Sequence, residues 1–419
     1  MTPAAFRIRV PTSTLRDLRT RLATTRWPSE LRGSGWDVGT SLAWLQSLVE
    51  YWRDHFDWPA QEESINRFAH YRSEIDGLGL HFIHERGHGP DPLPLLLTHG
   101  WPDSFLRMQK IIPLLADPAA YGGDEADAFD VVVPSLPGFG FSDAPARALG
   151  SRETADLLAH LMTHVLGYKR FGAHGGDLGS GISEMLARHH GASMVGIHLT
   201  DVPLWHLSEM PTEQLSTIER AYAEAGKRWQ MNEGAFALLQ ATRPQTLAYG
   251  LNDSPVGLAA WIAEKLRAWS DCDGDVERCF SRDELLTHIT LYWVTHTIGS
   301  SFLPYYAAHH GTPGGSGRVD VPTGIAIFPK DWVSAPREFA ERLFNLRRYT
   351  VMPRGGHFAA LEQPDLLVED IRALFRPLRA GAHAGETWPQ TLSTRAMQAL
   401  RSHGRSLSLG HAHRAKLLR

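Results

Sequence analysis

A glycine-rich segment around one acidic residue constrains the fold of this chain more than any other stretch. Residues 171–180 read Phe-Gly-Ala-His-Gly-Gly-Asp-Leu-Gly-Ser, and helix-compatible sequence follows at 182–188. An apolar run that leads into small residues and then a helix predicts a strand, a sharp turn and a helix. A carboxylate at the tip of that turn, Asp177, can attack an electrophilic carbon directly. Taken alone, the pattern fits equally well a loop whose Asp177 merely caps the helix.

Short apolar runs alternate with helical patterns on both sides of this turn. Strand-like runs occur at 80–84, 93–98, 130–133, 170–174 and 195–199. The alternation resumes at 324–328 and 349–352, before a closing helix at 364–375. This alternation predicts an α/β fold, a mostly parallel sheet with helices on both faces. Ligand chemistry in such sheets collects at the carboxyl ends of the strands.

Three further segments flank or interrupt this pattern. Residues 1–73 carry two amphipathic helix patterns and predict an N-terminal helical arm. Residues 202–320 are helical and rich in aromatic residues, so we expect them to form a cap inserted between two core segments, 74–201 and 321–379. Residues 380–419 hold six Lys or Arg and one acidic residue, and predict a flexible basic tail rather than a nucleic-acid-binding one.

Composition narrows the class of protein further. The chain has 419 residues, of which 43% are hydrophobic and 21% charged, as in an ordinary globular protein. The net charge is -4, so the chain lacks the excess of positive charge that favours binding to nucleic acid or to an anionic membrane. No apolar run is long enough to span a membrane and no signal sequence begins the chain, so we expect a cytoplasmic protein. Cys272 and Cys279 lack the partners of a zinc site, so we expect free thiols, no metal and no cofactor.

Nucleophilic catalysis on an α/β sheet needs a base and an acid to orient it, in the chain order nucleophile, acid, histidine. His357 lies in the glycine-flanked loop 354–358 after the last strand, and we expect it to be the base. Asp331 follows the strand before that of the histidine and is the preferred acid. Asp201, at the entrance to the predicted cap, is the alternative acid, or else a hinge or helix cap.

The loop His-Gly-Trp-Pro at 99–102 follows another predicted strand. A backbone N–H from Trp101 and one from Leu178 would point at the oxyanion that forms when water attacks an ester of Asp177. A plain strand-to-helix turn would use Gly and Pro equally well.

Together these motifs resemble the epoxide hydrolases of microsomal and juvenile-hormone type, an α/β-hydrolase family with an additional N-terminal domain. The resemblance covers residues 6–376. It rests on Arg-Trp-Pro at 26–28, Trp-Asp at 36–37, the loop at 99–102, Gly-Gly-Asp at 175–177, the segment 251–260 and Arg-Gly-Gly-His-Phe-Ala-Ala at 354–360. It implies hydrolysis of a small-molecule epoxide to a vicinal diol without cofactor, with Asp177 as nucleophile, Asp331 as acid and His357 as base.

The family also uses two cap tyrosines that hold and protonate the epoxide oxygen. Tyr305 matches one of them. This chain has Phe236 where the other is expected, and Tyr249 and Tyr306 are the candidates to supply the missing hydroxyl. Phe236, Tyr249 and Tyr306 are the candidates for lining the substrate pocket, and Tyr305 is expected to be catalytic.

Two alternatives stay open beside this interpretation. A haloalkane dehalogenase shares the aspartate nucleophile, but its pattern has Trp where this chain has Leu178, and it lacks the N-terminal arm. A non-catalytic or weakly active ligand-binding relative is suggested by Phe236. The retained nucleophile, acid and base argue against it, because a binding protein does not need them. Asp103, where the family usually has Gly, is a further departure, and the oligomeric state stays open, with a homodimer as one option.

Overall fold

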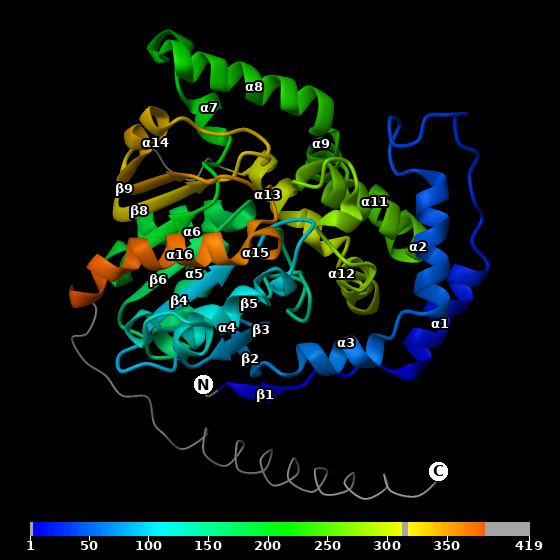
Figure 1. Ribbon diagram of the computed structural model, residues 1–419, viewed down its shortest axis with the longest axis horizontal. Helices are drawn as coiled ribbons and strands as arrows, with labels where there is room; N and C mark the ends of the chain where they lie inside the picture. Colours follow the sequence, from blue (N-terminus) through cyan, green and yellow to red (C-terminus); the bar gives the residue numbers. More distant parts are fainter. Residues whose placement is uncertain (1–2, 312–316, 382–419) are drawn as a thin grey trace, which may run out of the picture. The chain divides into compact units, whose positions relative to one another are not determined.

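The computed structural model describes residues 3–311 and 317–381. They contain one nine-stranded sheet with the strand order β1-β2-β3-β5-β4-β6-β7-β8-β9 (Figure 1). The strands are β1 (Ala4–Phe6), β2 (His70–Ile75), β3 (Leu78–Glu85), β4 (Leu93–Thr98), β5 (Phe129–Pro134), β6 (Phe171–Gly175), β7 (Met194–Leu199), β8 (Val319–Ile327) and β9 (Phe344–Val351). Pairing is antiparallel from β1 to β5 and parallel among β5, β4, β6, β7, β8 and β9. The predicted α/β class with a mostly parallel sheet is confirmed.

The parallel register decides which loops meet. Leu97 of β4 pairs with His174 of β6, and Thr98 pairs with Gly175. The two strands therefore end side by side, which brings the loop at 99–102 next to the turn at Asp177.

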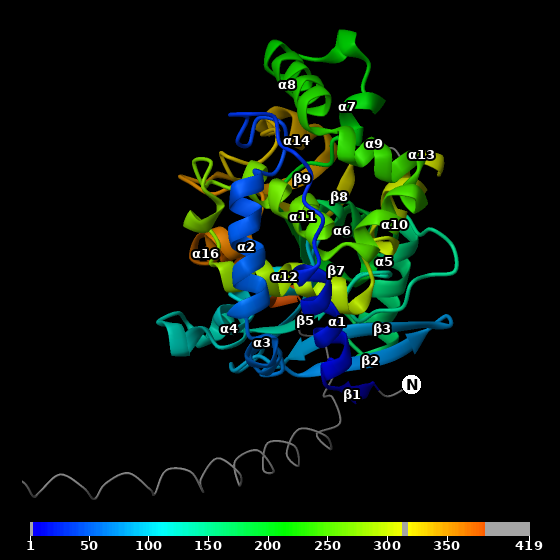
Figure 2. The same ribbon diagram turned by 90° about the vertical axis from the view of Figure 1, so that its right-hand side faces the viewer.

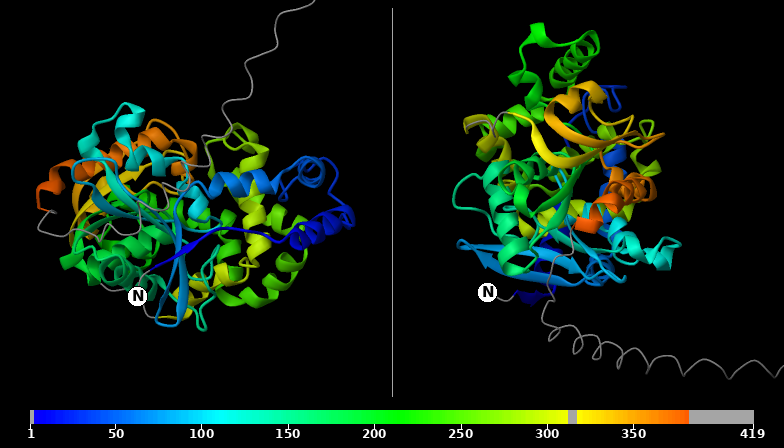
Figure 3. Two further views of the ribbon diagram at one scale, coloured as in Figure 1. Left: turned by 90° about the horizontal axis from the view of Figure 1, so that it is seen from below. Right: turned by 90° about the vertical axis from the view of Figure 1, so that its left-hand side faces the viewer.

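Helices cover both faces of the sheet. The core helices are α4 (Ile111–Ala116), α5 (Ser151–His160), α6 (Leu178–His189), α14 (Arg337–Leu343), α15 (Ala359–Glu362) and α16 (Pro364–Phe375). Helices α5 and α6 pack together on one face, and α4 and α16 pack together on the other (Figure 3). The central strands β4, β5, β6 and β7 are apolar and almost fully buried, because a parallel sheet with helices on both faces has no side exposed to water.

The first 73 residues form α1 (Thr12–Ala23), α2 (Leu42–Asp54) and α3 (Trp58–Ile65), of which α1 and α2 match the two predicted helix patterns. They also contain β1 and the start of β2, which the sequence did not predict. Strand β1 is three residues long and carries no apolar alternation. It adds to the sheet edge through its pairing with β2, and Phe6 packs against the rings of His81 and Phe141.

A helical segment lies between β7 and β8 in the chain. It contains α7 (Trp205–Glu209), α8 (Thr217–Glu233), α9 (Ala235–Thr242), α10 (Pro244–Asp253), α11 (Pro255–Trp269), α12 (Arg282–Thr295) and α13 (Leu303–His310). Helices α1 and α2 lie against α11 and α12 (Figure 2). Trp52 of α2 donates its indole N–H to Thr290 of α12 over 3.0 Å in a buried contact. The N-terminal helices thus fix the position of the inserted ones.

All these elements belong to one compact unit, Met1–His383. The predicted tail lies outside the described residues from residue 382 onward. Within the described part of the chain, every helix is too short or too polar to cross a membrane. The same part contains no group of His, Cys, Asp and Glu side chains arranged to hold a metal ion. Cys272 and Cys279 are free, as expected.

Candidate active site

The turn between β6 and α6 has the strained backbone that its glycines suggest. Asp177 adopts a φ of 58°, in the left-handed region that L-residues rarely occupy. A Cβ at Gly179 would collide with the carbonyl oxygen of Thr98, and one at Gly100 would collide with the carboxylate of Asp177. Glycine at these two positions therefore lets the turn and the loop of residues 99–102 approach each other closely.

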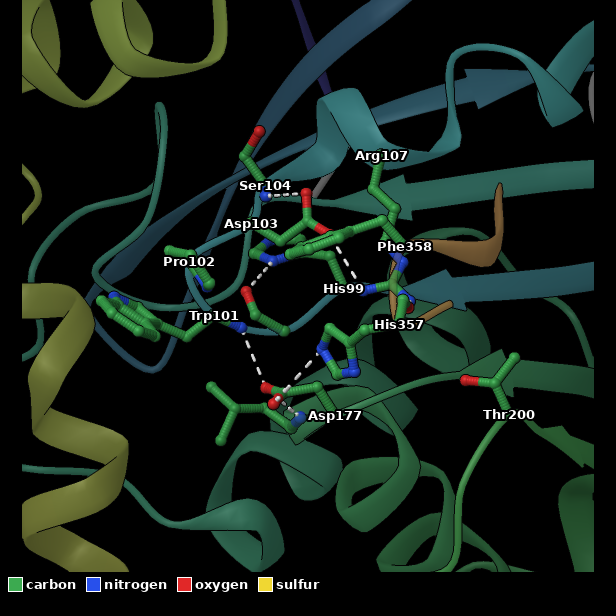
Figure 4. A network of polar contacts seen from close by, with 12 residues as sticks. His99, Trp101, Pro102, Asp103, Ser104, Arg107, Asp177, Thr200, His357 and Phe358 are labelled. Carbon is green, nitrogen blue, oxygen red and sulfur yellow. Dashed lines mark hydrogen bonds and ion pairs between the residues drawn. The ribbon is translucent and has the colours of Figure 1, made fainter. Parts of the chain in front are cut away.

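The structure brings Asp177, His357 and Asp331 together from the ends of three different strands. Nδ1 of His357 lies 2.9 Å from Oδ1 of Asp331, and Nε2 lies 3.8 Å from Oδ2 of Asp177. The side chains are nearly inaccessible, with exposed fractions of 1% for His357, 4% for Asp177 and 9% for Asp331. Figure 4 shows the imidazole facing the Asp177 carboxylate. A proton on Nδ1 leaves Nε2 as the basic nitrogen on the side of Asp177.

The two oxygens of Asp177 have different surroundings. Oδ1 accepts hydrogen bonds from the backbone N–H of Trp101 at 2.9 Å and from that of Leu178 at 2.6 Å. These are the two N–H groups that the sequence marked as candidate oxyanion donors. Oδ2 faces the imidazole, whose Nε2 has no hydrogen-bond partner among the described residues. One carboxylate oxygen is thus held and the other is available.

A buried ion pair fixes the loop that supplies the Trp101 donor. Asp103 and Arg107 lie 2.9 Å apart with side chains only 1% and 2% exposed. Arg107 also donates to the backbone carbonyl oxygen of His357 (Figure 4). The hydroxyl of Tyr292 donates to the backbone oxygen of Asp103 over 2.6 Å. This pair therefore links the donor loop to the loop of His357. Arg107 was not predicted as a site residue, although its spacing of four residues from Asp103 is typical of an ion pair on a helix.

Asp201, the alternative acid, binds the turn rather than the imidazole. Its Oδ1 accepts from the backbone N–H of Asp177 at 2.9 Å and from the hydroxyl of Ser180 at 2.7 Å. Asp331 is the carboxylate within hydrogen-bond distance of His357 Nδ1. Burial, reinforced by the negative charge of Asp331, raises the pKa of Asp201 to about 7.

The charges at the site also shift the pKa values of the reacting groups. Burial raises the pKa of Asp177, while the charge of His357 and the N–H groups of Trp101 and Leu178 oppose that rise. Burial would lower the pKa of His357, but the charge and hydrogen bond of Asp331 outweigh it, with a smaller contribution from Asp177. The net pKa shift of His357 is upward.

Tyr305 and the three candidate pocket residues divide into two groups. Phe236 on α9 is 3% exposed and stacks on the Trp101 ring, with centroids 5.1 Å apart. The Tyr305 ring on α13 lies 6.0 Å from that of Phe236 and 6.1 Å from that of Trp101. Burial, with the nearby charge of Asp177, raises the pKa of Tyr305 well above its ordinary value. Tyr305 therefore keeps its proton and can donate it.

The structure gives no support to the prediction that Tyr249 or Tyr306 supplies a second hydroxyl at this site. Tyr249 is 70% exposed on α10, and Tyr306 is 38% exposed. Tyr306 follows Tyr305 in α13, so the helix turns it to a different face, where it stacks on His310 with centroids 4.1 Å apart.

Two tryptophans that the sequence did not single out enclose the imidazole. The Trp332 ring stacks on His357 at 4.3 Å between centroids, and the Trp269 ring meets it edge-on at 5.4 Å. Trp332 directly follows Asp331, whereas Trp269 comes from the end of α11 and could be placed here only by the fold. Both rings shield the His357 imidazole from bulk water.

Comparison with known proteins agrees with this geometry. Residues 3–108 match the model of the epoxide hydrolase N terminus, and residues 94–364 match that of the alpha/beta hydrolase fold. Epoxide hydrolase 1 of Sus scrofa is 36% identical over 402 residues, covering 88% of this chain and 87% of its own length. The chain belongs to the epoxide hydrolase family.

Further members of this family are similar over most of their length. A protein of Stigmatella aurantiaca, named provisionally as an epoxide hydrolase, is 46% identical over 377 residues, covering 90% of this chain and 85% of its own. The solved structure of Aspergillus niger epoxide hydrolase superposes with a TM-score of 0.78 at 29% identity, covering 90% of this chain and 97% of that one. The family predicted from the motifs and the α/β-hydrolase fold are both confirmed.

Proposed function

We propose that this protein hydrolyses an epoxide to a vicinal diol through a covalent ester on Asp177. The observation that carries the proposal is the unequal treatment of the two Asp177 oxygens. Oδ1 already accepts two backbone hydrogen bonds, whereas Oδ2 points toward His357 without a hydrogen bond to it. One oxygen must be free to attack the epoxide, and the other must later carry the negative charge that forms when water attacks the ester. The two oxygens therefore need different surroundings.

In the first step Oδ2 attacks an epoxide carbon. The new carbon–oxygen bond forms as the ring carbon–oxygen bond breaks, and its electron pair stays on the epoxide oxygen. Tyr305 gives its proton to that oxygen, so no free alkoxide has to leave. The raised pKa of Tyr305 supports this role because it keeps the phenol protonated until the alkoxide develops.

In the second step water attacks the ester carbonyl carbon. His357 takes a proton from the water, with Asp331 holding Nδ1 and stabilising the imidazolium. The negative charge appears on Oδ1, where the N–H groups of Trp101 and Leu178 already lie. Losing one such donor typically costs about 3 kcal/mol in the barrier. Collapse of the intermediate breaks the ester bond, and the imidazolium gives its proton to the departing alkoxide, which leaves as the diol. Asp177 keeps the hydroxyl that came from water, and return of that proton to the Tyr305 phenolate restores both the carboxylate and the phenol.

Ester formation itself prepares the base. The negative charge of Asp177 is one of the causes that raise the pKa of His357. Esterification removes that charge, so the pKa of His357 falls and the neutral imidazole is favoured when water must be deprotonated. The nucleophile and the base are thus active in turn.

We also assign helices α7 to α13, within residues 202–320, the role of a cap over the carboxyl ends of the strands, between core segments 74–201 and 321–379. Phe236 on α9 and Tyr305 on α13 support this assignment, because both rings pack on Trp101 beside the nucleophile.

Trapping the ester tests the proposed function. His357→Gln should still form the ester but not hydrolyse it, so intact mass spectrometry after incubation with aryl and alkyl epoxides should show one added substrate mass. Peptide mapping should place the adduct on Asp177, and the matched control His357→Gln/Asp177→Asn should show none. Turnover retained in Asp177→Ala, or no adduct from folded His357→Gln, would refute the mechanism.

A further inference from the structure

Gln240 is a buried amide without a partner. It lies on α9 one helical turn after Phe236 and on the same buried face of that helix. Its side chain is fully buried, with an exposed fraction of 0%. Neither Nε2 nor Oε1 has a hydrogen-bond partner among the described residues. An amide in this state lowers the free energy of unfolding, because on folding it loses its hydrogen bonds to water and forms none in the protein.

Other unpartnered donors adjoin Phe236. The ring of Trp101 stacks on Phe236, and that of Trp269 lies 5.1 Å away between centroids. The indole Nε1 of each is buried and lacks a partner within the described part of the chain. The ammonium group of Lys265 lies 5.1 Å from the centre of the Phe236 ring. Lys265 already pairs with Glu264, so the unpartnered groups are the two indole N–H donors and the amide of Gln240, which offers both a donor and an acceptor. Donor groups outnumber acceptors among them, so their complement is a hydrogen-bond acceptor.

The cluster is close to the reacting groups. Helix α9 packs against α13, which carries Tyr305, and the backbone N–H of Trp101 binds Asp177. A molecule held beside Phe236 therefore lies against the same loop as the nucleophile.

From this arrangement we infer that Gln240, with the indole N–H groups of Trp101 and Trp269, binds a carbonyl group of the substrate. The natural substrate is then an epoxide that also carries an ester, amide or ketone oxygen. This inference rests on the proposed function and adds the substrate class to it. The epoxide is opened at Asp177, while the donors at Gln240 recognise the second oxygen and set the orientation.

Paired substrates test the inference. Glycidyl butyrate and terminal octene oxide have chains of equal length, and only the former carries a carbonyl oxygen. Gln240→Met keeps the length of the side chain and removes its donors. We expect kcat/KM for glycidyl butyrate to fall about tenfold, the effect of one lost hydrogen bond, and that for octene oxide to stay within about twofold. Mass spectrometry of the product checks that the ester itself stays intact.

Gln109→Met is the matched control. Gln109 Nε2 is also buried and unpartnered among the described residues, but Gln109 directly follows the short helix of residues 105–108 and is not part of the cluster at Phe236. It should leave the ratio of the two kcat/KM values unchanged. Gln240→Met should unfold at the same or a higher temperature than the wild type, because an unsatisfied amide is removed.

Three results would overturn the inference. Equal losses with both epoxides would assign Gln240 a structural role, and no loss with either would show that the amide is not used. A change of the ratio in Gln109→Met would show that the effect is not specific to Gln240. Failure of the wild type to hydrolyse either epoxide would instead refute the proposed function, and the substrate class with it.

Discussion

The buried pair of Asp103 and Arg107 offers a direct test of how the site is held together. In Arg107→Met the carboxylate of Asp103, 1% exposed, loses the cation that lies 2.9 Å away. Removing one partner of a buried ion pair typically costs about 3–5 kcal/mol. The change also leaves the carbonyl oxygen of His357 without this donor. We therefore expect a loss of about 4 kcal/mol in the free energy of unfolding.

This loss is measurable by urea unfolding and by calorimetry. At about 2.1 cal/mol/K per residue, the unit Met1–His383 has an unfolding entropy of about 0.8 kcal/mol/K, so Tm should fall by about 5 °C. Asp103→Asn/Arg107→Met removes both charges and should recover about half of the loss. Arg147→Met, which breaks an exposed pair with Glu153, should cost at most about 1 kcal/mol.

Two results would refute this reasoning about the pair. One is a loss below about 1 kcal/mol in Arg107→Met, which would match an exposed pair. The other is a double variant no more stable than the single one, which would show that the uncompensated charge is not the cause. In the folded fraction of Arg107→Met, kcat should fall by a larger factor than KM changes. The reason is that Arg107 holds both the loop of Trp101, through Asp103, and the backbone of His357.

Three further predictions concern individual side chains. Burial raises the pKa of Asp201 to about 7, so the stability that this carboxyl group contributes is present at low pH and is lost as the pH rises from about 4 to about 7. The free energy of unfolding of the wild type, measured in urea relative to that of Asp201→Asn, should therefore decrease across that window. A difference that stays constant with pH would contradict this. Tyr305→Phe should slow ester formation by about a hundredfold, whereas Tyr249→Phe and Tyr306→Phe, at exposed positions, should change it by less than about twofold. Phe236→Tyr should raise the single-turnover rate of ester formation, and an unchanged or lower rate would show that a second hydroxyl is not limiting.

Strong local signals explain which parts of the fold were predictable. The strand, turn and helix around Asp177 follow from an apolar run and glycines, and the seven predicted strands all exist in the described residues. Strands β1 and β2 escaped prediction because pairing between backbones, and not the side-chain pattern, places them at the sheet edge. Such pairing is a long-range property of the folded chain.

Sheet order decides between the two candidate acids. Strand β7 lies next to β6, so Asp201 at its end reaches the turn of Asp177. Strand β8 lies next to β9, so Asp331 reaches His357. Chain order alone favoured Asp331 but did not exclude Asp201, because the sequence does not state which strands are neighbours.

Residues outside the motifs were harder to predict. Tyr249 and Tyr306 were chosen for their hydroxyl groups, yet the rotation of each helix decides whether a residue faces the site. Gln240 gave no signal because a buried amide is recognised only from the absence of partners in three dimensions. The sequence therefore predicted which residues meet at the candidate site better than it predicted the side chains that surround them.

The position of Asp201 beside the site has a kinetic consequence. The charge of His357 lowers the pKa of Asp201, and the interaction is reciprocal, so ionised Asp201 raises the pKa of His357. Hydrolysis of the ester needs a neutral His357, and ionisation of Asp201 near pH 7 opposes that form. Asp201→Asn keeps an oxygen acceptor for the turn at Asp177. In this variant the rate of ester hydrolysis should begin to rise at a lower pH than in the wild type. Rapid-quench measurement of ester decay across pH checks this, and a shift to higher pH would show that Asp201 acts on the base in another way.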